Sequence, residues 1–242
     1  TDEEVGGFDG TKYQIDEGVC SDFVIAGETT NFNIVNEAKG ILWLKISTKG
    51  KTAHGAYPWR GENAIWKIQG FLMELQKAYP ITTEEEWKKS IKIRSIETSN
   101  QSFNKIPDDC NISLDIRYLP EDNKTILLNI KRLLPKGFKL EVLVKEPPLY
   151  TSATNPYLSK LKKITSKHIH KPIKLYGAQG SSDARHFTQV GCPGVEFGPI
   201  GGGIGTDKEW ISLNSMHKYK EILNDFLLSL ISNNLKAVMN FW

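Results

Sequence analysis

Three carboxylates near the start of the chain are the first residues whose types could do chemistry. Glu3 and Glu4 are adjacent and precede a glycine pair. Neighbouring carboxylates in one loop can divide their roles, one binding a metal ion and the other acting as a general base on water. The alternative is a solvated acidic turn. Glu28 directly follows the apolar run at 23–26, where a strand end would hold it rigidly as a metal ligand or, alternatively, as a cap.

Three more side chains occupy segments that could present them to a ligand. His54 lies among small residues and turn formers in GKTAHGAYP, where it can reach a ligand or satisfy loop backbone groups. Asn104 precedes Arg117 by thirteen residues, and Arg117 lies on the polar side of an alternating segment. A guanidinium there can bind a carboxylate through two hydrogen bonds. For Asn104 or Arg117 alone, a solvated face is the alternative.

A glycine-bounded loop at 177–187 contains Ser182, Asp183 and Arg185 and opens a predicted helix. Backbone N–H groups at the start of a helix favour an anion. The phosphate-binding pattern with its lysine is missing, so a carboxylate or a reaction oxyanion fits as well as phosphate does.

The elements between residues 40 and 146 have the order β-α-β-β-α-β. Apolar residues alternate in the predicted strands and recur at helical spacing in the predicted helices. This order is the split pattern of a ferredoxin-like sandwich. The expected strands are 38–47, 90–97, 110–119 and 138–144, and the expected helices are 63–79 and 120–134.

The flanking segments read as one α/β domain that the sandwich interrupts, with boundaries near 39–42 and 147–150. Short apolar runs at 23–26 and 194–197 are typical of buried strands. Helices are expected at about 155–170 and at 213–233.

Composition limits the classes of function. The net charge of +3 is too small and too evenly spread for a nucleic-acid partner, and the basic stretch 160–174 suits the wet face of a helix. Three widely spaced cysteines without a CxxC motif fit a reducing compartment, so a cytoplasmic location is expected. No apolar run approaches the ~20 residues of a membrane span.

Taken in order, these motifs resemble the M20 family of metal-dependent amidohydrolases and exopeptidases, which includes acetylornithine deacetylase, succinyl-diaminopimelate desuccinylase, carboxypeptidase G2-like enzymes and dipeptidases. The match runs from Asp2 to about Leu230. The resemblance implies Glu3 as the general base, with Glu4 and Glu28 as metal ligands. It also implies that His54 stabilises the oxyanion in the partner subunit's site.

The same resemblance implies the remaining roles and the fold. Asn104 and Arg117 would hold the substrate or its carboxylate, and Ser182, Asp183 and Arg185 would line the substrate pocket. The expected fold is α/β, a partial catalytic domain at 1–40 and 150–242 with a ferredoxin-like lid and dimerisation domain inserted at 41–149. The implied cofactor is a divalent metal, Zn²⁺ or else Co²⁺ or Mn²⁺, two per site. The implied partners are an N-acyl amino acid or small peptide and a second copy of the chain.

The chain departs from the family pattern in two places. The family's first metal ligands, a His and a bridging Asp, lie upstream of the Glu pair and have no counterpart here, so a truncated amino terminus is expected. A metal-binding His is also expected four residues before Glu209, but Gly205 occupies that position. His217 falls eight residues after Glu209 on the last helix, and Thr206 or Asp207 could substitute for the missing ligand.

The sequence therefore predicts a metal-dependent hydrolase of amide bonds, inactive as this chain alone. The alternative, favoured by Gly205, is a non-catalytic relative that binds amino acids or peptides. A purely structural dimerisation module is a third hypothesis.

Overall fold

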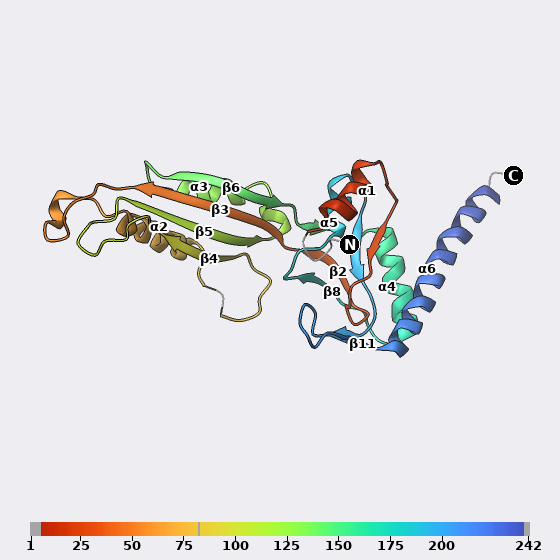
Figure 1. The fold of residues 1–242 in the computed structure, drawn as a ribbon. Helices are drawn as coiled ribbons and strands as arrows, with labels where there is room; N and C mark the ends of the chain where they lie inside the picture. Colours follow the sequence, from red (N-terminus) through yellow and green to blue (C-terminus); the bar gives the residue numbers. More distant parts are fainter. Residues whose placement is uncertain (1–5, 82, 240–242) are drawn as a thin grey trace. The chain divides into compact units, whose positions relative to one another are not determined.

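The structure is a computed structural model that describes residues 6–81 and 83–239 (Figure 1). It divides into two compact units. Unit 1 comprises Thr1–Ala38 with Leu149–Trp242, and unit 2 comprises Lys39–Pro148. Unit 2 is therefore an insertion in the chain of unit 1.

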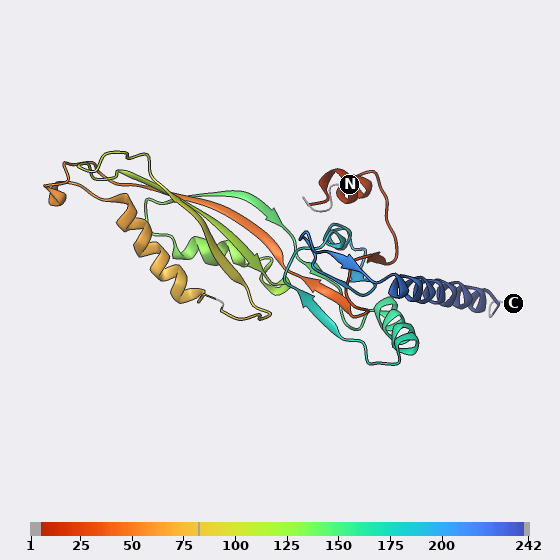
Figure 2. The same ribbon diagram turned by 60° about the horizontal axis from the view of Figure 1, so that its bottom comes forward.

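Unit 2 is a four-stranded antiparallel sheet in the order β4-β5-β3-β6. Two helices cover one of its faces, and the other face is open (Figure 2). The predicted β-α-β-β-α-β order is confirmed. In chain order the elements are β3 (Gly40–Lys49), α2 (Ala64–Ala78), β4 (Ser90–Glu97), β5 (Asp109–Tyr118), α3 (Ile126–Leu133) and β6 (Lys139–Glu146).

The core of unit 2 follows from the alternation in β5. Ile112, Leu114 and Ile116 are at most 2% exposed and point toward the helices, whereas the residues between them face the open side. Asn63 caps α2, because its side-chain oxygen accepts from the Ile65 amide at 2.9 Å. Phe71 of α2 completes the contact with the sheet.

Two predicted boundaries in unit 2 were wrong. The strand expected from residue 38 begins at Gly40, where a Cβ would overlap the ring of Tyr118. The helix expected over 120–134 is a 3₁₀ turn, Pro120–Asp122, followed by α3 (Ile126–Leu133). Asp and Asn compete with helical backbone bonds, which explains the break at Asp122 and Asn123.

The sheet of unit 1 is built around β2, which the sequence analysis did not identify. Strands β9 and β7 pair with successive halves of β2, β8 pairs with its other edge, and β1 extends the sheet beyond β9 in parallel. Its strands are β1 (Val24–Ala26), β2 (Ile34–Ala38), β7 (Leu149–Tyr150), β8 (Leu175–Ala178) and β9 (Gly194–Phe197).

Helices cover both faces of this sheet. Helices α4 (Pro156–Ile169) and α6 (Leu213–Met239) pack on the face that carries Ile34 and Phe197. The short α5 (Ala184–Gln189) packs on the opposite face against Val35. The remaining elements are η2 (Phe8–Lys12), α1 (Tyr13–Asp16), η3 (Pro58–Arg60) and the hairpin β10 (Gly201–Gly202) with β11 (Trp210–Ile211). None of the helices in the described residues has the length and apolar character that a membrane crossing requires.

Candidate functional site

The proposed base and first ligand, Glu3 and Glu4, lie outside the described residues. Glu28, the other predicted ligand, follows the carboxyl end of β1 and is half-buried. Its amide donates to the carbonyl oxygen of Ala26 at 3.0 Å, and its own carbonyl lies so close to Gly198 that a Cβ there would overlap it. The backbone at Glu28 is thus held by the neighbouring strand end, as the sequence analysis expected for a ligand position.

Glu196 is a buried carboxylate that the sequence analysis did not single out. It lies on β9, opposite Ala26 of β1, and is 9% exposed. Burial, together with Glu196, raises the pKa of Tyr176 on β8. An ionisable residue inside the apolar run GVEF was the signal that could have identified it.

The 182–186 loop is buried and bonded within unit 1. Ser182, Asp183 and Arg185 are 2%, 9% and 2% exposed. Arg185 Nη1 donates to the Ser182 carbonyl oxygen at 2.9 Å and to Asp183 Oδ1 at 3.1 Å. The Ser182 hydroxyl accepts from the amide of Ala184, the first residue of α5. The Arg185 guanidinium is therefore bonded to groups of the chain itself, and the Asp183 carboxylate makes no side-chain hydrogen bond to the start of α5.

The same loop contacts the segment that follows the Glu pair. Arg185 Nη2 and His186 Nε2 both lie within hydrogen-bond distance of the Gly6 carbonyl oxygen, at 2.8 and 2.9 Å. Because a carbonyl oxygen can only accept, Nε2 of His186 carries the proton. The sequence analysis did not identify His186.

Unit 2 brings His54 and Asn104 together. The Gly55 amide donates to the Asn104 carbonyl oxygen at 2.6 Å, and the Ile106 amide donates to the Ala53 carbonyl oxygen at 2.9 Å. Both His54 and Asn104 are exposed, and His54 Nδ1 accepts from the Ala56 amide at 3.1 Å. The imidazole keeps Nε2 available for a ligand.

Arg117 is held by its neighbour on β5. Its Nε and Nη2 donate to the two oxygens of Asp115 at 2.9 and 3.4 Å, and the Arg117 side chain is 30% exposed. Burial and the nearby Arg117 guanidinium lower the pKa of Lys39, which lies at the same end of the sheet and places its ammonium 5.8 Å from the centre of the Trp87 ring. Two cations at one strand end suit an anionic group.

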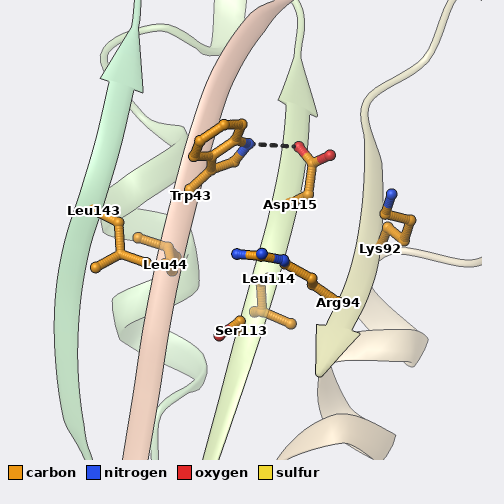
Figure 3. A pocket seen from close by; sticks show the side chains of 8 residues that line it. All are labelled: Trp43, Leu44, Lys92, Arg94, Ser113, Leu114, Asp115 and Leu143. Carbon is orange, nitrogen blue, oxygen red and sulfur yellow. Dashed lines mark hydrogen bonds between the residues drawn. The ribbon is translucent and has the colours of Figure 1, made fainter. Parts of the chain in front are cut away.

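A hollow of about 270 Å³ adjoins this ion pair on the open face of the sheet (Figure 3). Trp43 Nε1 donates to Asp115 Oδ1 at 3.1 Å, so indole and guanidinium share one carboxylate. Arg94 extends from β4 across Leu114 toward the strand of Trp43 (Figure 3). These bonds fix Asp115, and through it the direction of Arg117.

Arg117 and His54 lie at opposite ends of unit 2. Arg117 pairs with Ile41, where the chain enters the unit, and Asp109 pairs with Lys49 at the end next to the His54 loop. The length of β5 from Asp109 to Arg117 is roughly 27 Å at ~3.4 Å per residue. One small substrate cannot touch both side chains of a single copy.

The described residues do not form a complete metal site. No group of three His, Cys, Asp or Glu side chains able to hold a metal ion occurs among them. Gly205 has no side chain that could bind a metal, and its amide donates to Glu209 Oε2 at 3.2 Å. His217 is exposed on α6. Of the two predicted ligands, only Glu28 lies in the described part of the chain, and one carboxylate does not make a metal centre.

Comparison with known proteins identifies the class. Residues 36–139 match the peptidase dimerisation domain of the M20 family. This match confirms the resemblance to the M20 family drawn from the motifs.

Two curated relatives are succinyl-diaminopimelate desuccinylases. The protein of Hydrogenovibrio crunogenus is 23% identical over 220 residues, which cover 87% of this chain and 58% of the relative. The protein of Hahella chejuensis is 26% identical, and the alignment covers 94% of this chain and 64% of the relative. The chain thus spans about three fifths of the length of these relatives.

Solved structures show the same fold. The aminopeptidase PepT of Bacillus cereus superposes with a TM-score of 0.78 at 20% identity, covering 93% of this chain and 61% of that one. The M20 metallo-carboxypeptidase Sso-CP2 of Sulfolobus solfataricus gives 0.65 at 16% identity, covering 93% and 68%. The predicted α/β class is confirmed.

Proposed function

We propose that this chain is part of an M20-type hydrolase that cleaves an amide bond of an N-acyl amino acid or small peptide. The observation that carries the proposal is the match of residues 36–139 to the family's dimerisation domain, a range that includes His54, Asn104 and Arg117. Unit 1 would belong to the catalytic domain, and unit 2 would be the lid. Three unpaired cysteines fit a cytoplasmic location.

Each proposed role follows from the chemistry of the side chain. Glu3 would take a proton from the attacking water and return it to the leaving amine. His54 would donate from Nε2 to the oxyanion of the tetrahedral intermediate. Arg117 would bind the substrate carboxylate with the N–H donors that Asp115 does not use.

The separation within unit 2 supports a homodimer. The stretch of β5 from Asp109, at the end of the sheet next to the His54 loop, to Arg117 is roughly 27 Å long, so His54 and Arg117 would serve different sites. A second copy would then supply His54 and Asn104 to the site whose carboxylate is bound by Arg117. The family resemblance implies the same exchange.

The metal would be a divalent ion such as Zn²⁺ or Co²⁺, held in part by Glu4 and Glu28. When bound, such an ion lowers the pKa of water and polarises a carbonyl. Because Gly205 stands where the family resemblance implies a metal-binding His, we predict that the 242-residue chain alone does not hydrolyse amides even with added Zn²⁺ or Co²⁺. Robust metal-dependent hydrolysis by this chain would refute the ligand assignment.

The test of the function uses the complete product of the gene that encodes this chain. N-succinyl and N-acetyl amino acids and tripeptides are assayed with wild type and with Glu3→Gln. Loss of the base should lower kcat by about 10²–10⁴-fold with little change in KM. An unchanged rate for Glu3→Gln would exclude Glu3 as the base.

Gly205 favours a second candidate, a binding protein that has lost a metal ligand. In that case the gene product would bind N-acyl amino acids in calorimetry but release no free amine. Hydrolysis coupled to metal content would exclude this candidate.

A further inference from the structure

The backbone of Gly6 and Gly7 is enclosed by three side chains far away in sequence. Arg185 Nη2 and His186 Nε2 both donate to the Gly6 carbonyl oxygen, at 2.8 and 2.9 Å. Asp183 Oδ1 accepts from Arg185 Nη1 at 3.1 Å and so fixes the guanidinium. Two donors on one acceptor hold that peptide from two directions.

Asp183 also closes the other side of the segment. Its Oδ2 accepts from the Thr11 hydroxyl at 3.0 Å. Gly7 has a φ of +66°, and a Cβ added there would overlap the Asp183 carboxylate. Gly7 is therefore required both by its left-handed backbone and by close approach to a charged group.

The hydrogen bonds of this clamp are strong because its side chains are buried. Arg185, His186 and Asp183 are 2%, 6% and 9% exposed. Charge-assisted hydrogen bonds are shorter and stronger than neutral ones, and a buried guanidinium that loses its partners is costly. Nη1 and Nη2 of Arg185 thus bond to groups of the protein itself, namely Ser182, Asp183 and Gly6.

We propose that Asp183, Arg185 and His186 are positioning residues that clamp the Gly6–Gly7 segment, the backbone that follows the Glu pair in the sequence. Glu3, the proposed base, is three residues upstream of Gly6 in the sequence, and three residues span at most ~11 Å, so the clamp anchors the chain next to the base. The catalytic meaning of the clamp rests on the proposed function, in which Glu3 is the base. This role differs from the lining of the substrate pocket that the resemblance implies for Asp183 and Arg185.

The clamp is tested by amide hydrogen exchange, which needs no activity. The Lys12 amide donates to the Gly7 carbonyl oxygen at 2.8 Å, so exchange at residues 8–12 reports on the clamped segment. Arg185→Met should accelerate this exchange at least about tenfold while α4 exchanges as in wild type, and Arg185→Lys should restore part of the protection. Equal acceleration in both segments, or none, would overturn the clamp.

A glycine pair provides the matched control. Gly7→Ala forces the segment off Asp183 without touching the donors. Gly18→Ala carries a similar backbone strain, at φ +89°, but a Cβ at Gly18 meets nothing within 4 Å. Only Gly7→Ala should accelerate amide hydrogen exchange at residues 8–12. Equal acceleration by the two variants would contradict the contact with Asp183.

Kinetics of the gene product separate positioning from substrate binding. Arg185→Lys should lower kcat and leave KM unchanged, because the base is displaced and the substrate contacts are not. A raised KM with unchanged kcat would show that Arg185 binds substrate and would overturn its positioning role. If wild type does not hydrolyse any substrate, the proposed function fails, and the exchange comparison decides the clamp.

Discussion

The amide of Gly55 donates a 2.6 Å hydrogen bond to the carbonyl oxygen of Asn104. This bond continues the antiparallel bridge between His54 and Lys105. The His54 loop and the Asn104 segment are therefore one structural element at one end of unit 2. His54, which precedes Gly55, and Asn104, which accepts this bond, would therefore act in the same site.

His54→Ala should reduce catalysis without affecting the fold. The side chain is exposed, so the free energy of unfolding should change by no more than about 0.5 kcal/mol. Loss of an oxyanion donor should lower kcat of the gene product by about 10²–10³-fold. The control is His217→Ala, which removes an exposed imidazole from α6; equal kinetic effects of the two variants would rule out a specific role for His54.

Arg117→Ala should weaken the binding of substrates that carry a free carboxylate. A hydrogen bond to a charged group contributes about 1.5–3 kcal/mol, so KM should rise roughly 10- to 100-fold. The matching substrate with an amidated terminus should show no change. As a control, Arg94→Ala removes another guanidinium from the same open face and should leave KM for both substrates unaltered. If Arg94→Ala raises KM as Arg117→Ala does, Arg117 is not the specific carboxylate-binding residue.

The gene product should be a dimer that forms through the edge strand β4. Strand β4 is an edge of the sheet and exposes Ile93 and Ile96, at 46% and 52%. An exposed apolar edge is a template for pairing with another strand. In sedimentation equilibrium, Ile96→Lys should yield monomers. Val142→Lys, on the opposite edge strand β6, should leave the dimer intact. Monomers in Val142→Lys with an intact dimer in Ile96→Lys would assign the interface to β6.

Unit 2 should lose stability in alkali through Tyr118. This tyrosine is fully buried, and its hydroxyl donates to the Glu146 carbonyl oxygen at 2.7 Å. Burial, with a smaller effect of Glu146, raises the pKa of Tyr118 from 10.0 to about 12. The neutral form is favoured in the folded state, so its contribution is present below pH 10 and is lost as pH rises toward 12.

Urea unfolding at pH 9 and at pH 11.5 measures this loss, which should be on the order of 2 kcal/mol. Tyr118→Phe should be less stable at pH 9 but should lack this component of the pH dependence. A slope that survives in Tyr118→Phe would assign the effect to other groups.

Unit 2 could be predicted well because its signals are local. The alternation of apolar residues predicted β4 and β5, and their helical spacing predicted α2. The break after Asp122 was not predicted, because Pro120 followed by Glu121 and Asp122 is the pattern of a helix start. Strand β2 was missed in unit 1, since its run Ile34–Ala38 includes Asn36 and Glu37 and so lacks a continuous apolar pattern.

The candidate site was less predictable because its contacts are distant in sequence. The proximity of His54 to Asn104 depends on a bridge between two loops, and motif spacing does not encode it. The bonds from Arg185 and His186 to Gly6 join the two ends of unit 1. Residue types suggested chemistry at 182–185, but only the fold shows these side chains turned toward the protein's own backbone.

The central claim, that the chain has an M20-type metal site in which Gly205 occupies the place of one ligand, is tested by metal content. Elemental analysis compares the gene product with its Gly205→His variant. A Cβ at Gly205 meets nothing within 4 Å, so an imidazole has room there despite a φ of +71°. Gly18→His, also at positive φ and in open space, is the matched control. Bound Zn²⁺ or Co²⁺ should increase by about one ion per chain in Gly205→His alone. An unchanged metal content in Gly205→His, or an equal increase in the control, would contradict the account.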